Sequence, residues 1–271
     1  MKILLTGANG NLGKVVAANL KKYSITVIES SSKPKNGQRF FDLNLKNFTG
    51  LLDEIDVVVH CSRGIEQDHL SNDLKFVEYC FNKNVNLIYI GSASSWLESP
   101  NKYGIYKKQV ENLVLNLGGV VISCGLIYGD RYKGQIYKLS YMLRNLPVKV
   151  QIKNSNQQYL TPLNALVSEI YRQINAPEKF KRIFLVHAWR ISFNNLLLSL
   201  GSRSPLKIQL GKAVVESLVS LPLFKSNYFG IDSLSGIYGN YSSDLQTQSI
   251  DKSKFVDTTF PCLFIKSKYF D

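Results

Sequence analysis

The chain has 271 residues, of which 45% are hydrophobic and 20% are charged, so it can bury a core and is not disordered in composition. It contains no run of roughly 18 apolar residues that could span a membrane. Its first residues lack the basic region and cleavage site of a secretory signal. We therefore expect a soluble, cytoplasmic protein with no membrane span.

The formal net charge of +13 is unusual for a chain of this size. Such a charge attracts nucleic acid, anionic lipid or a phosphorylated small molecule by the same long-range physics. The lysines are scattered, and no nucleic-acid-binding module is recognisable in the sequence. We therefore interpret the charge as a basic solvated surface and expect no nucleic-acid partner.

The cysteines lie far apart in the sequence and mostly in apolar surroundings. None belongs to a CxxC pair or to a Cys/His spacing typical of a metal site. We interpret them as reduced core residues and expect no bound metal. They are Cys61, Cys80, Cys124 and Cys262.

The first half of the chain alternates between two patterns. Runs rich in Ile, Val and Leu are typical of buried parallel strands, and the stretches between them have apolar residues at helical spacing. This alternation predicts an α/β fold with a Rossmann-type doubly wound parallel sheet. The predicted strands are Lys2–Leu5, Ile25–Ile28, Val57–His60, Leu87–Ile90 and Val120–Ile122, and the predicted helices are Leu12–Leu20, Leu70–Phe81 and Tyr103–Leu117.

After Gly129 the alternation loosens. We predict a dinucleotide-binding domain over residues 1–130 and a smaller C-terminal α/β substrate-binding lobe over residues 131–271, packed on the first and sharing some elements with it. The predicted helices in this half are Ile136–Leu143, Leu163–Ile174, Phe193–Leu200 and Ala213–Leu221, and the predicted strands are Val148–Ile152 and Ile183–Val186.

Residues 6–13 read TGANGNLG and follow the first predicted strand directly. Here Gly7 would permit a tight turn, Gly10 would let backbone N–H groups approach a pyrophosphate, and Gly13 would let the following helix pack closely. A strand before the glycines and a helix after them make this a dinucleotide site. The other cofactor contacts expected in the turn are Asn9, Asn11 and Leu12.

Glu29 stands at the end of the second predicted strand, near the position of a ribose-binding acid. Its carboxylate would accept hydrogen bonds from a ribose 2′-OH and would repel a 2′-phosphate, which favours NAD. The following residues 30–33, which read SSSK, could instead bind a 2′-phosphate, so NADP stays open. The alternative for Glu29 itself is a solvated strand end.

Further motifs follow in a fixed order. Residues 41–43 read FDL, residues 58–62 VVHCS, residues 86–94 NLIYIGSAS and residues 103–111 YGIYKKQVE. With the glycine turn, these segments resemble the extended short-chain dehydrogenase/reductases, the NAD-dependent sugar epimerase/dehydratase family. The resemblance covers most of residues 1–190 and implies NAD as cofactor, a nucleotide sugar as substrate and a homodimer.

The resemblance also implies roles for particular residues. Tyr103 and Lys107, four residues apart on one helix, would be the catalytic acid/base and the lysine that binds the ribose and lowers the tyrosine pKa. Ser92 would hydrogen-bond the reacting oxygen, with Ser94 as the alternative donor. Tyr106 is a weaker candidate because Val110, not lysine, lies four residues beyond it. The other cofactor contacts implied are Asp42 and Leu43 beside the adenine, and Cys61 and Ser62 after the fourth strand of the family's fold.

Some positions depart from the family pattern. Ser94 and Ser95 stand where the family's 4,6-dehydratases carry an Asp-Glu pair, which disfavours dehydration. Residues 121–130, which resemble the RPGxxYG turn, have Ser123 and Cys124 in place of Arg-Pro and retain Tyr128, which we expect, like Ser94, to contact the substrate.

Two further departures concern the substrate side. Asn164 replaces a typical aspartate, and only 11 residues separate Ser92 from Tyr103, which predicts a more open substrate pocket.

These observations predict an NAD(P)-dependent oxidoreductase or epimerase that acts on a nucleotide-linked sugar by hydride transfer. The sequence does not separate epimerisation from one-way reduction of a keto sugar. The alternative is a nucleotide-binding regulatory or redox-sensing protein of the same fold without turnover, against which the intact Ser92, Tyr103 and Lys107 argue. We expect no catalytic role for the three histidines, for which packing or a surface position is the better account, and His60 ends an apolar strand. The histidines are His60, His69 and His187.

Overall fold

The computed structural model divides the chain into two compact units that alternate along the sequence. Unit 1 comprises residues 1–91, 106–123 and 164–183, and unit 2 comprises residues 92–105, 124–163 and 184–271. The predicted boundary after residue 130 stays a prediction. The structure describes residues 1–44, 47–62, 67–98, 100–129, 133–177, 179, 181–185, 191–201, 206–220, 238 and 240.

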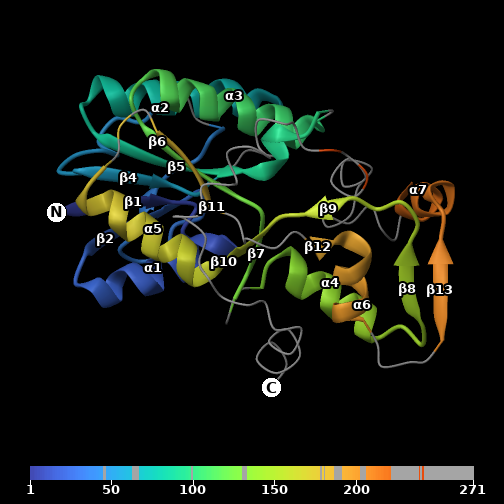
Figure 1. The fold of residues 1–271 in the computed structure, drawn as a ribbon. Helices are drawn as coiled ribbons and strands as arrows, with labels where there is room; N and C mark the ends of the chain where they lie inside the picture. Colours follow the sequence, from blue (N-terminus) through green and yellow to red (C-terminus); the bar gives the residue numbers. More distant parts are fainter. Residues whose placement is uncertain are drawn as a thin grey trace. The chain divides into compact units, whose positions relative to one another are not determined.

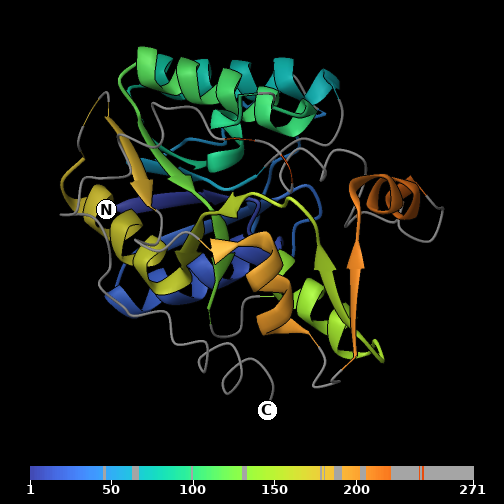
Figure 2. The ribbon, with the colours of Figure 1, turned by 45° about the vertical axis from the view of Figure 1, so that its right-hand side comes forward.

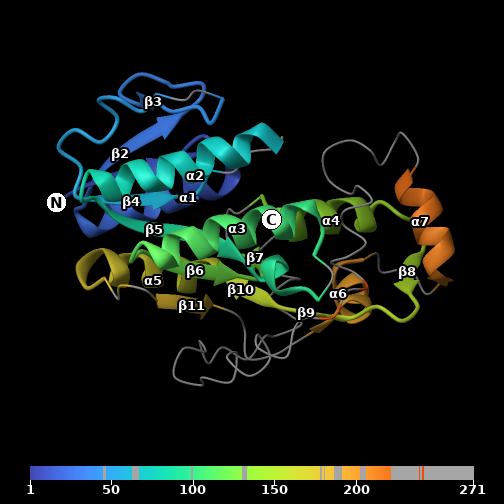
Figure 3. The same cartoon turned by 90° about the horizontal axis from the view of Figure 1, so that it is seen from above.

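The centre of unit 1 is a seven-stranded sheet in the order β11-β6-β5-β4-β1-β2-β3 (Figure 3). Strands β3, β2, β1, β4 and β5 run parallel to their neighbours. This order, which reverses between β1 and β4, is that of a doubly wound sheet. The strands are β1 (Lys2–Thr6), β2 (Thr26–Ser31), β3 (Arg39–Phe40), β4 (Val57–His60), β5 (Asn86–Ser92), β6 (Val120–Cys124) and β11 (Lys181–Leu185).

Helices cover both faces of this sheet (Figure 1). Helices α2 and α3 lie on one face, and α1 and α5 lie on the other. The predicted Rossmann-type fold is therefore confirmed. The helices are α1 (Asn11–Leu20), α2 (Gln67–Asn82), α3 (Lys102–Asn116) and α5 (Leu163–Asn175), with a short 3₁₀ turn, η1 (Lys21–Tyr23), after α1.

The two layers of helices explain why the strands are apolar on both faces. Ile3, Leu4 and Leu5 on β1 are all fully buried, as expected for a central strand of a covered parallel sheet. On the α2/α3 side, Phe76 and Val110 pack with the β strands in one hydrophobic cluster. The sheet therefore forms a rigid base for the loops at the carboxyl ends of its strands.

Unit 2 has its own smaller core. Helices α4 and α6 pack together; α4 also contacts β7, and α6 packs on β8 of the parallel pair β8–β13 (Figures 1 and 2). The cluster includes Leu139, Ile152, Leu160 and Leu196. The elements are η2 (Ala93–Trp96), β7 (Leu126–Tyr128), α4 (Gln135–Arg144), β8 (Lys149–Ile152), β9 (Gln157–Gln158), β10 (Leu160–Pro162), β12 (Ile191–Ser192), α6 (Phe193–Leu200), β13 (Lys207–Leu210) and α7 (Lys212–Ser220).

The predicted elements are present with small shifts of their ends. The strand expected at residues 25–28 begins at Thr26 and continues to Ser31, because the backbone stays paired beyond the apolar run. Strand β8 begins one residue later than expected, and α2 begins earlier, at Gln67. Val186 and Leu221, the predicted ends of a strand and a helix, lie outside the described residues, as do His187 and Cys262.

Within the described part of the chain, no helix has the length and apolar character needed to cross a membrane.

Candidate functional site

The candidate site begins where the strand order reverses. Strands β1 and β4 are neighbours in the sheet, with Thr6 beside His60 at their carboxyl ends. The glycine turn follows β1, and Cys61 and Ser62 follow β4. In open α/β sheets this switch point is the place where ligands bind.

The three glycines of the turn have different surroundings, which can be described by what a Cβ at each would contact. Gly7 has φ of +67°, and a Cβ on it would lie 3.0 Å from the Ser62 backbone. A Cβ on Gly13 would lie 2.2 Å from the Gly7 carbonyl oxygen, so α1 can pack on the turn only with glycine there. At Gly10 the Gly7 oxygen, at 3.1 Å, is the one described atom within 4 Å. Gly10 is therefore the least enclosed of the three by the described residues, although a Cβ there would crowd the Gly7 carbonyl oxygen.

The start of α1 can accept an anion. Gly10 is its N-cap, no side chain caps the helix, and no acidic residue lies in its first turn. The first N–H groups of an α-helix have no partner within the helix, and they carry partial positive charge. With Gly10 the least enclosed of the three glycines, this end of the helix fits the pyrophosphate role expected of residues 10–13.

Asn9 fastens the glycine turn to the loop after β2. Its Nδ2 donates to Ser31 Oγ (2.9 Å) and to the Lys33 carbonyl (2.7 Å). Gln38 Nε2 donates to Asn9 Oδ1 (3.1 Å) and to Glu29 Oε2 (2.8 Å). Asn9 therefore has a structural role in the turn, and Gln38, which the sequence analysis missed, connects it to Glu29.

Glu29 is already engaged by protein groups. Lys21 Nζ lies 2.6 Å from its Oε1. The hydrogen bond from Lys21 lowers the Glu29 pKa, with a further contribution from Gln38, while partial burial acts in the opposite direction. The carboxylate therefore stays ionised at neutral pH, as a ribose-binding acid must, but its ribose role stays a prediction.

The turn at residues 41–43 is fixed to helix α2. Asn72 Nδ2 donates to the Leu43 carbonyl (2.6 Å), and the Leu43 side chain is buried in the core. Asp42 Oδ1 accepts from the Asn44 N–H (2.9 Å), which closes a local turn. Asp42 is half-buried, and its predicted adenine contact stays a prediction.

Cys61 and Ser62 lie beside the glycine turn, as predicted for cofactor-lining residues, because Gly7 contacts their backbone. Burial raises the pKa of the Cys61 thiol to about 12, although the positive charge of Lys107 acts in the opposite direction. Among the described cysteines, Cys61, Cys80 and Cys124 are free thiols, and the last two are buried. The interpretation as reduced cysteines is confirmed for these three.

The raised pKa makes Cys61 an unreactive thiol. The thiolate is the reactive species, and a pKa raised to about 12 keeps the thiol protonated at all lower pH values. We expect iodoacetamide at about pH 8 to leave Cys61 unmodified in the folded protein and to modify it in urea. Peptide mapping by mass spectrometry measures this. Rapid labelling of Cys61 in the folded protein would contradict the expected burial.

Lys107 is buried at the carboxyl end of β5. Its Nζ donates to the Tyr89 hydroxyl (3.0 Å) and to the Ile90 carbonyl (2.8 Å), and it lies 4.4 Å from the centre of the Tyr89 ring. Contacts with described residues use two of the three N–H groups of the ammonium. The predicted contact of Lys107 with a ribose stays a prediction.

Ser92, Ser94 and Tyr103 belong to unit 2. Ser92 caps η2, because its Oγ accepts from the Ser94 N–H (3.2 Å). Gly104, the residue after Tyr103, lies against the same segment: a Cβ there would be 2.4 Å from the Ser94 carbonyl oxygen. The structure therefore brings the first turn of α3, with Tyr103, next to the serines at the end of β5.

Tyr106, the competing tyrosine, has a structural partner. Its hydroxyl donates to Asp73 Oδ2 (2.6 Å), and Asp73 is fully buried. Tyr103 therefore remains the catalytic candidate.

Tyr128, the predicted substrate contact, is half-buried in unit 2 at the end of β7. Burial raises the pKa of its hydroxyl, which stays protonated at neutral pH and could donate a hydrogen bond to a sugar. Its substrate role stays a prediction.

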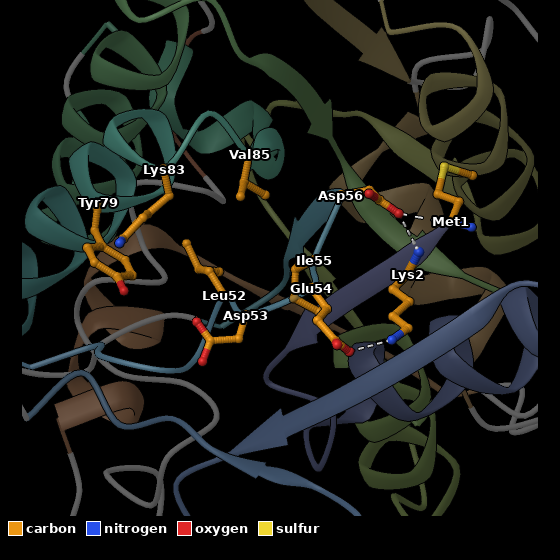
Figure 4. Close-up of a pocket in the computed structure, with 10 residues that line it drawn as sticks. All are labelled: Met1, Lys2, Leu52, Asp53, Glu54, Ile55, Asp56, Tyr79, Lys83 and Val85. Atoms are coloured by element: carbon orange, nitrogen blue, oxygen red, sulfur yellow. Dashed lines mark hydrogen bonds and ion pairs between the residues drawn. The ribbon is translucent and has the colours of Figure 1, made fainter.

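A hollow of about 690 Å³ lies at the other edge of the sheet in unit 1 (Figure 4). It is bordered by the amino ends of β1, β4 and β5. Three of its charged residues contact each other: Lys2 Nζ lies 2.5 Å from Glu54 Oε2, and the Lys2 N–H donates to Asp56. The predicted site residues of unit 1 lie at the carboxyl edge, so this hollow is not part of the candidate site. The described residues include no metal-binding group of histidine, cysteine or carboxylate side chains.

The sheet order and the covering helices define unit 1 as a Rossmann-type fold. No protein-family model and no curated protein sequence matches the chain. Among solved structures, it is similar to UDP-N-acetylglucosamine 4-epimerase from Bacillus cereus, with a TM-score of 0.64, 15% identity, and coverage of 78% of this chain and 85% of that one.

The structure is also similar to dTDP-4-dehydrorhamnose reductase from Yersinia enterocolitica, with a TM-score of 0.66, 17% identity, and coverage of 79% and 85% of the two chains. For MoeE5 in complex with UDP-glucose and NAD, the TM-score is 0.63, the identity is 17%, and the coverage is 92% of this chain and 97% of that one. At these identities the likeness establishes the fold. The fold implied by the sequence resemblance is thus confirmed.

Proposed function

We propose that this chain is an NAD-dependent enzyme of the extended short-chain dehydrogenase/reductase family that epimerises or reduces a nucleotide-linked sugar. The observation that carries the proposal is the glycine turn at the switch point, where Gly10, at the start of α1, is less enclosed by described residues than Gly7 and Gly13. Several neighbours in structure are complexes with NAD, and their names specify nucleotide sugars.

The residues present fit NAD. The start of α1 would hold the pyrophosphate, and the remaining N–H of Lys107 would hold the nicotinamide ribose. The ionised Glu29 favours a ribose 2′-OH over a 2′-phosphate, so we propose NAD in preference to NADP.

NAD, when bound, would take or give the hydride. Within this chain, the hydroxyl of Tyr103 would remove the proton from a sugar hydroxyl or return it to a ketone. The Lys107 ammonium, one helical turn away on α3, would favour the ionised tyrosine. The Ser92 hydroxyl would donate a hydrogen bond to the reacting oxygen, where negative charge develops.

The positive charge of unit 2 also supports a nucleotide sugar as the proposed substrate. Among the described residues of unit 2, lysine and arginine outnumber aspartate and glutamate. A positive surface attracts the diphosphate of a nucleotide sugar. A homodimer remains an expectation from the family resemblance.

A matched pair of glycine substitutions tests the nucleotide site. Gly10→Ala places a methyl group in the space assigned to the pyrophosphate and 3.1 Å from the Gly7 oxygen, so we expect NADH affinity to fall about 10- to 100-fold and the loss of stability to be smaller than that of Gly13→Ala. Gly13→Ala places the methyl group against the Gly7 carbonyl, so we expect a loss of stability of about 1–3 kcal/mol. NADH fluorescence titration and urea unfolding measure the two effects.

The titration also tests the choice of nucleotide when it is repeated with NADPH. Binding of NADPH in preference to NADH would overturn the role of Glu29. If the wild-type protein bound neither nucleotide, the enzyme proposal would fail. Binding without conversion of any UDP-, dTDP- or GDP-linked sugar would favour the regulatory or redox-sensing alternative.

A further inference from the structure

A buried hydrogen-bonded network lies directly behind the candidate nucleotide site in unit 1. His60 Nδ1 lies 2.6 Å from Thr6 Oγ1, and His60 Nε2 lies 2.6 Å from Asp73 Oδ1. Thr6, His60 and Asp73 are each fully buried. We call the set Thr6, His60, Ser62, Asp73 and Tyr106 the His60 relay. It connects the carboxyl ends of β1 and β4 with helices α2 and α3.

The donors and acceptors of the His60 relay fit one arrangement of protons. Thr6 Oγ1 accepts from the Ser62 backbone N–H (3.3 Å) and from the Ser62 hydroxyl (3.0 Å), which uses both of its lone pairs. In this arrangement the Thr6 hydroxyl donates its proton to His60 Nδ1, because Nδ1 lies nearer to Thr6 Oγ1 (2.6 Å) than to Ser62 Oγ (3.2 Å).

The other half of the relay agrees with this arrangement. With Nδ1 as the acceptor, His60 carries its proton on Nε2 and donates it to Asp73 Oδ1. Asp73 Oδ2 accepts from the Tyr106 hydroxyl (2.6 Å), so both carboxylate oxygens are satisfied. A proton on His60 Nδ1 would require the Thr6 hydroxyl to turn and donate to Ser62 Oγ, which reverses the Thr6–Ser62 hydrogen bond.

Aromatic side chains surround His60, so its hydrogen bonds cannot be replaced by water. The His60 ring packs against Phe76 and Tyr89, with ring centres 5.1 and 5.5 Å away, and against the edge of Phe41. In such a dry environment an unsatisfied polar group is costly, so the hydrogen bonds must all be made together.

The relay contacts the candidate site at two places. Ser62 and Thr6 flank the backbone on which Gly7 packs. Tyr106 is next to Lys107 on α3, and Tyr89, which packs on His60, is the hydroxyl partner of Lys107.

We propose that His60, held as the neutral Nε2–H tautomer, is a positioning residue that fixes the Thr6–Ser62 backbone for the nucleotide and holds α3 in register with it. This inference rests on the proposed function, since it assigns the relay to the same nucleotide site. His60 touches no reacting atom; it acts through Thr6, Ser62 and Asp73.

Two conservative variants separate the two hydrogen bonds of the imidazole. His60→Asn keeps an acceptor near the place of Nδ1, which faces Thr6, and His60→Gln keeps a donor near the place of Nε2, which faces Asp73. Thr6 directly precedes the glycine turn, and only His60→Gln loses the hydrogen bond to Thr6. We therefore expect His60→Gln to weaken NADH binding at least about 10-fold and His60→Asn to weaken it less than about 3-fold. Val77→Ala, a buried truncation on α2 outside the relay, is the control: it should lower the melting temperature and leave the NADH Kd unchanged.

The tautomer is tested independently of any nucleotide. In the ¹⁵N NMR spectrum of the wild-type protein, His60 should show a protonated Nε2 and an unprotonated Nδ1. An Nδ1–H or doubly protonated ring would overturn the inference, as would equal NADH affinity for both variants and wild type. If the wild type bound no nucleotide, the proposed function and the positioning role would both fail. A correct tautomer with normal wild-type binding and unaffected variants would overturn only the positioning role.

Discussion

Tyr103→Phe is expected to lower the turnover of a nucleotide sugar by about 10²- to 10⁴-fold, because it removes the hydroxyl that would transfer the proton. The ring and its packing on α3 are kept, so we expect NADH affinity and stability to stay close to those of the wild-type protein. The measurement is conversion of a panel of UDP-, dTDP- and GDP-linked hexoses, followed by chromatography, alongside NADH titration.

The control for Tyr103→Phe is Tyr141→Phe. Tyr141 lies on α4 with 66% of its surface exposed, so loss of its hydroxyl should change neither turnover nor binding. A Tyr103→Phe variant with full turnover would refute the assignment of Tyr103. In that case Lys107 would still be present on α3, and another hydroxyl, such as that of Ser92 or Ser94, would have to transfer the proton.

Arg182→Met is expected to destabilise the protein by about 3–5 kcal/mol, the cost of leaving a buried charge without its partner. Arg182 on β11 pairs with Glu111 on α3, with side-chain exposures of 11% and 0%. Burial lowers the Arg182 pKa, while the Glu111 carboxylate opposes this and stabilises the charged form. Urea unfolding measures the loss of stability.

Two further variants sharpen this test. Arg172→Met removes the partner of Glu169 in an ion pair that is exposed at the arginine, so we expect a loss below about 1 kcal/mol. The double variant Arg182→Met/Glu111→Leu replaces the whole buried pair with apolar groups and should recover most of the stability lost in the single variant. A single-variant loss no larger than that of Arg172→Met would contradict the buried-charge explanation.

The fold could be predicted from the sequence because its strands are buried on both faces. Such strands are continuous apolar runs, as at residues 57–60, and in the helices between them the apolar residues recur with the helical period. The short strands of unit 2 could not be predicted in this way. Strands β9 and β12 have two residues each, too few to show any period, and their pairing joins positions far apart in the chain.

The glycine turn could be predicted because its steric demands are local. Gly7, Gly10 and Gly13 each have the surroundings expected of their place in the motif. The hydrogen bonds of Gln38, Asp73 and His60 could not be predicted. They depend on partners many residues away, and no local pattern marks a glutamine or an aspartate on a helix as part of a network. For His60 the sequence indicated packing or a surface position, and the structure shows a buried ring with two hydrogen bonds of 2.6 Å.

The alternation of the two units along the chain has a consequence for how the protein can be cut. A fragment that ends at residue 130 would lack α5 and β11. It would expose β6 as an unpaired sheet edge, uncover part of one face of the sheet and leave Glu111 without Arg182. Unit 1 is therefore completed only after the chain has passed through two segments of unit 2, so a cut after residue 130 cannot release unit 1 intact.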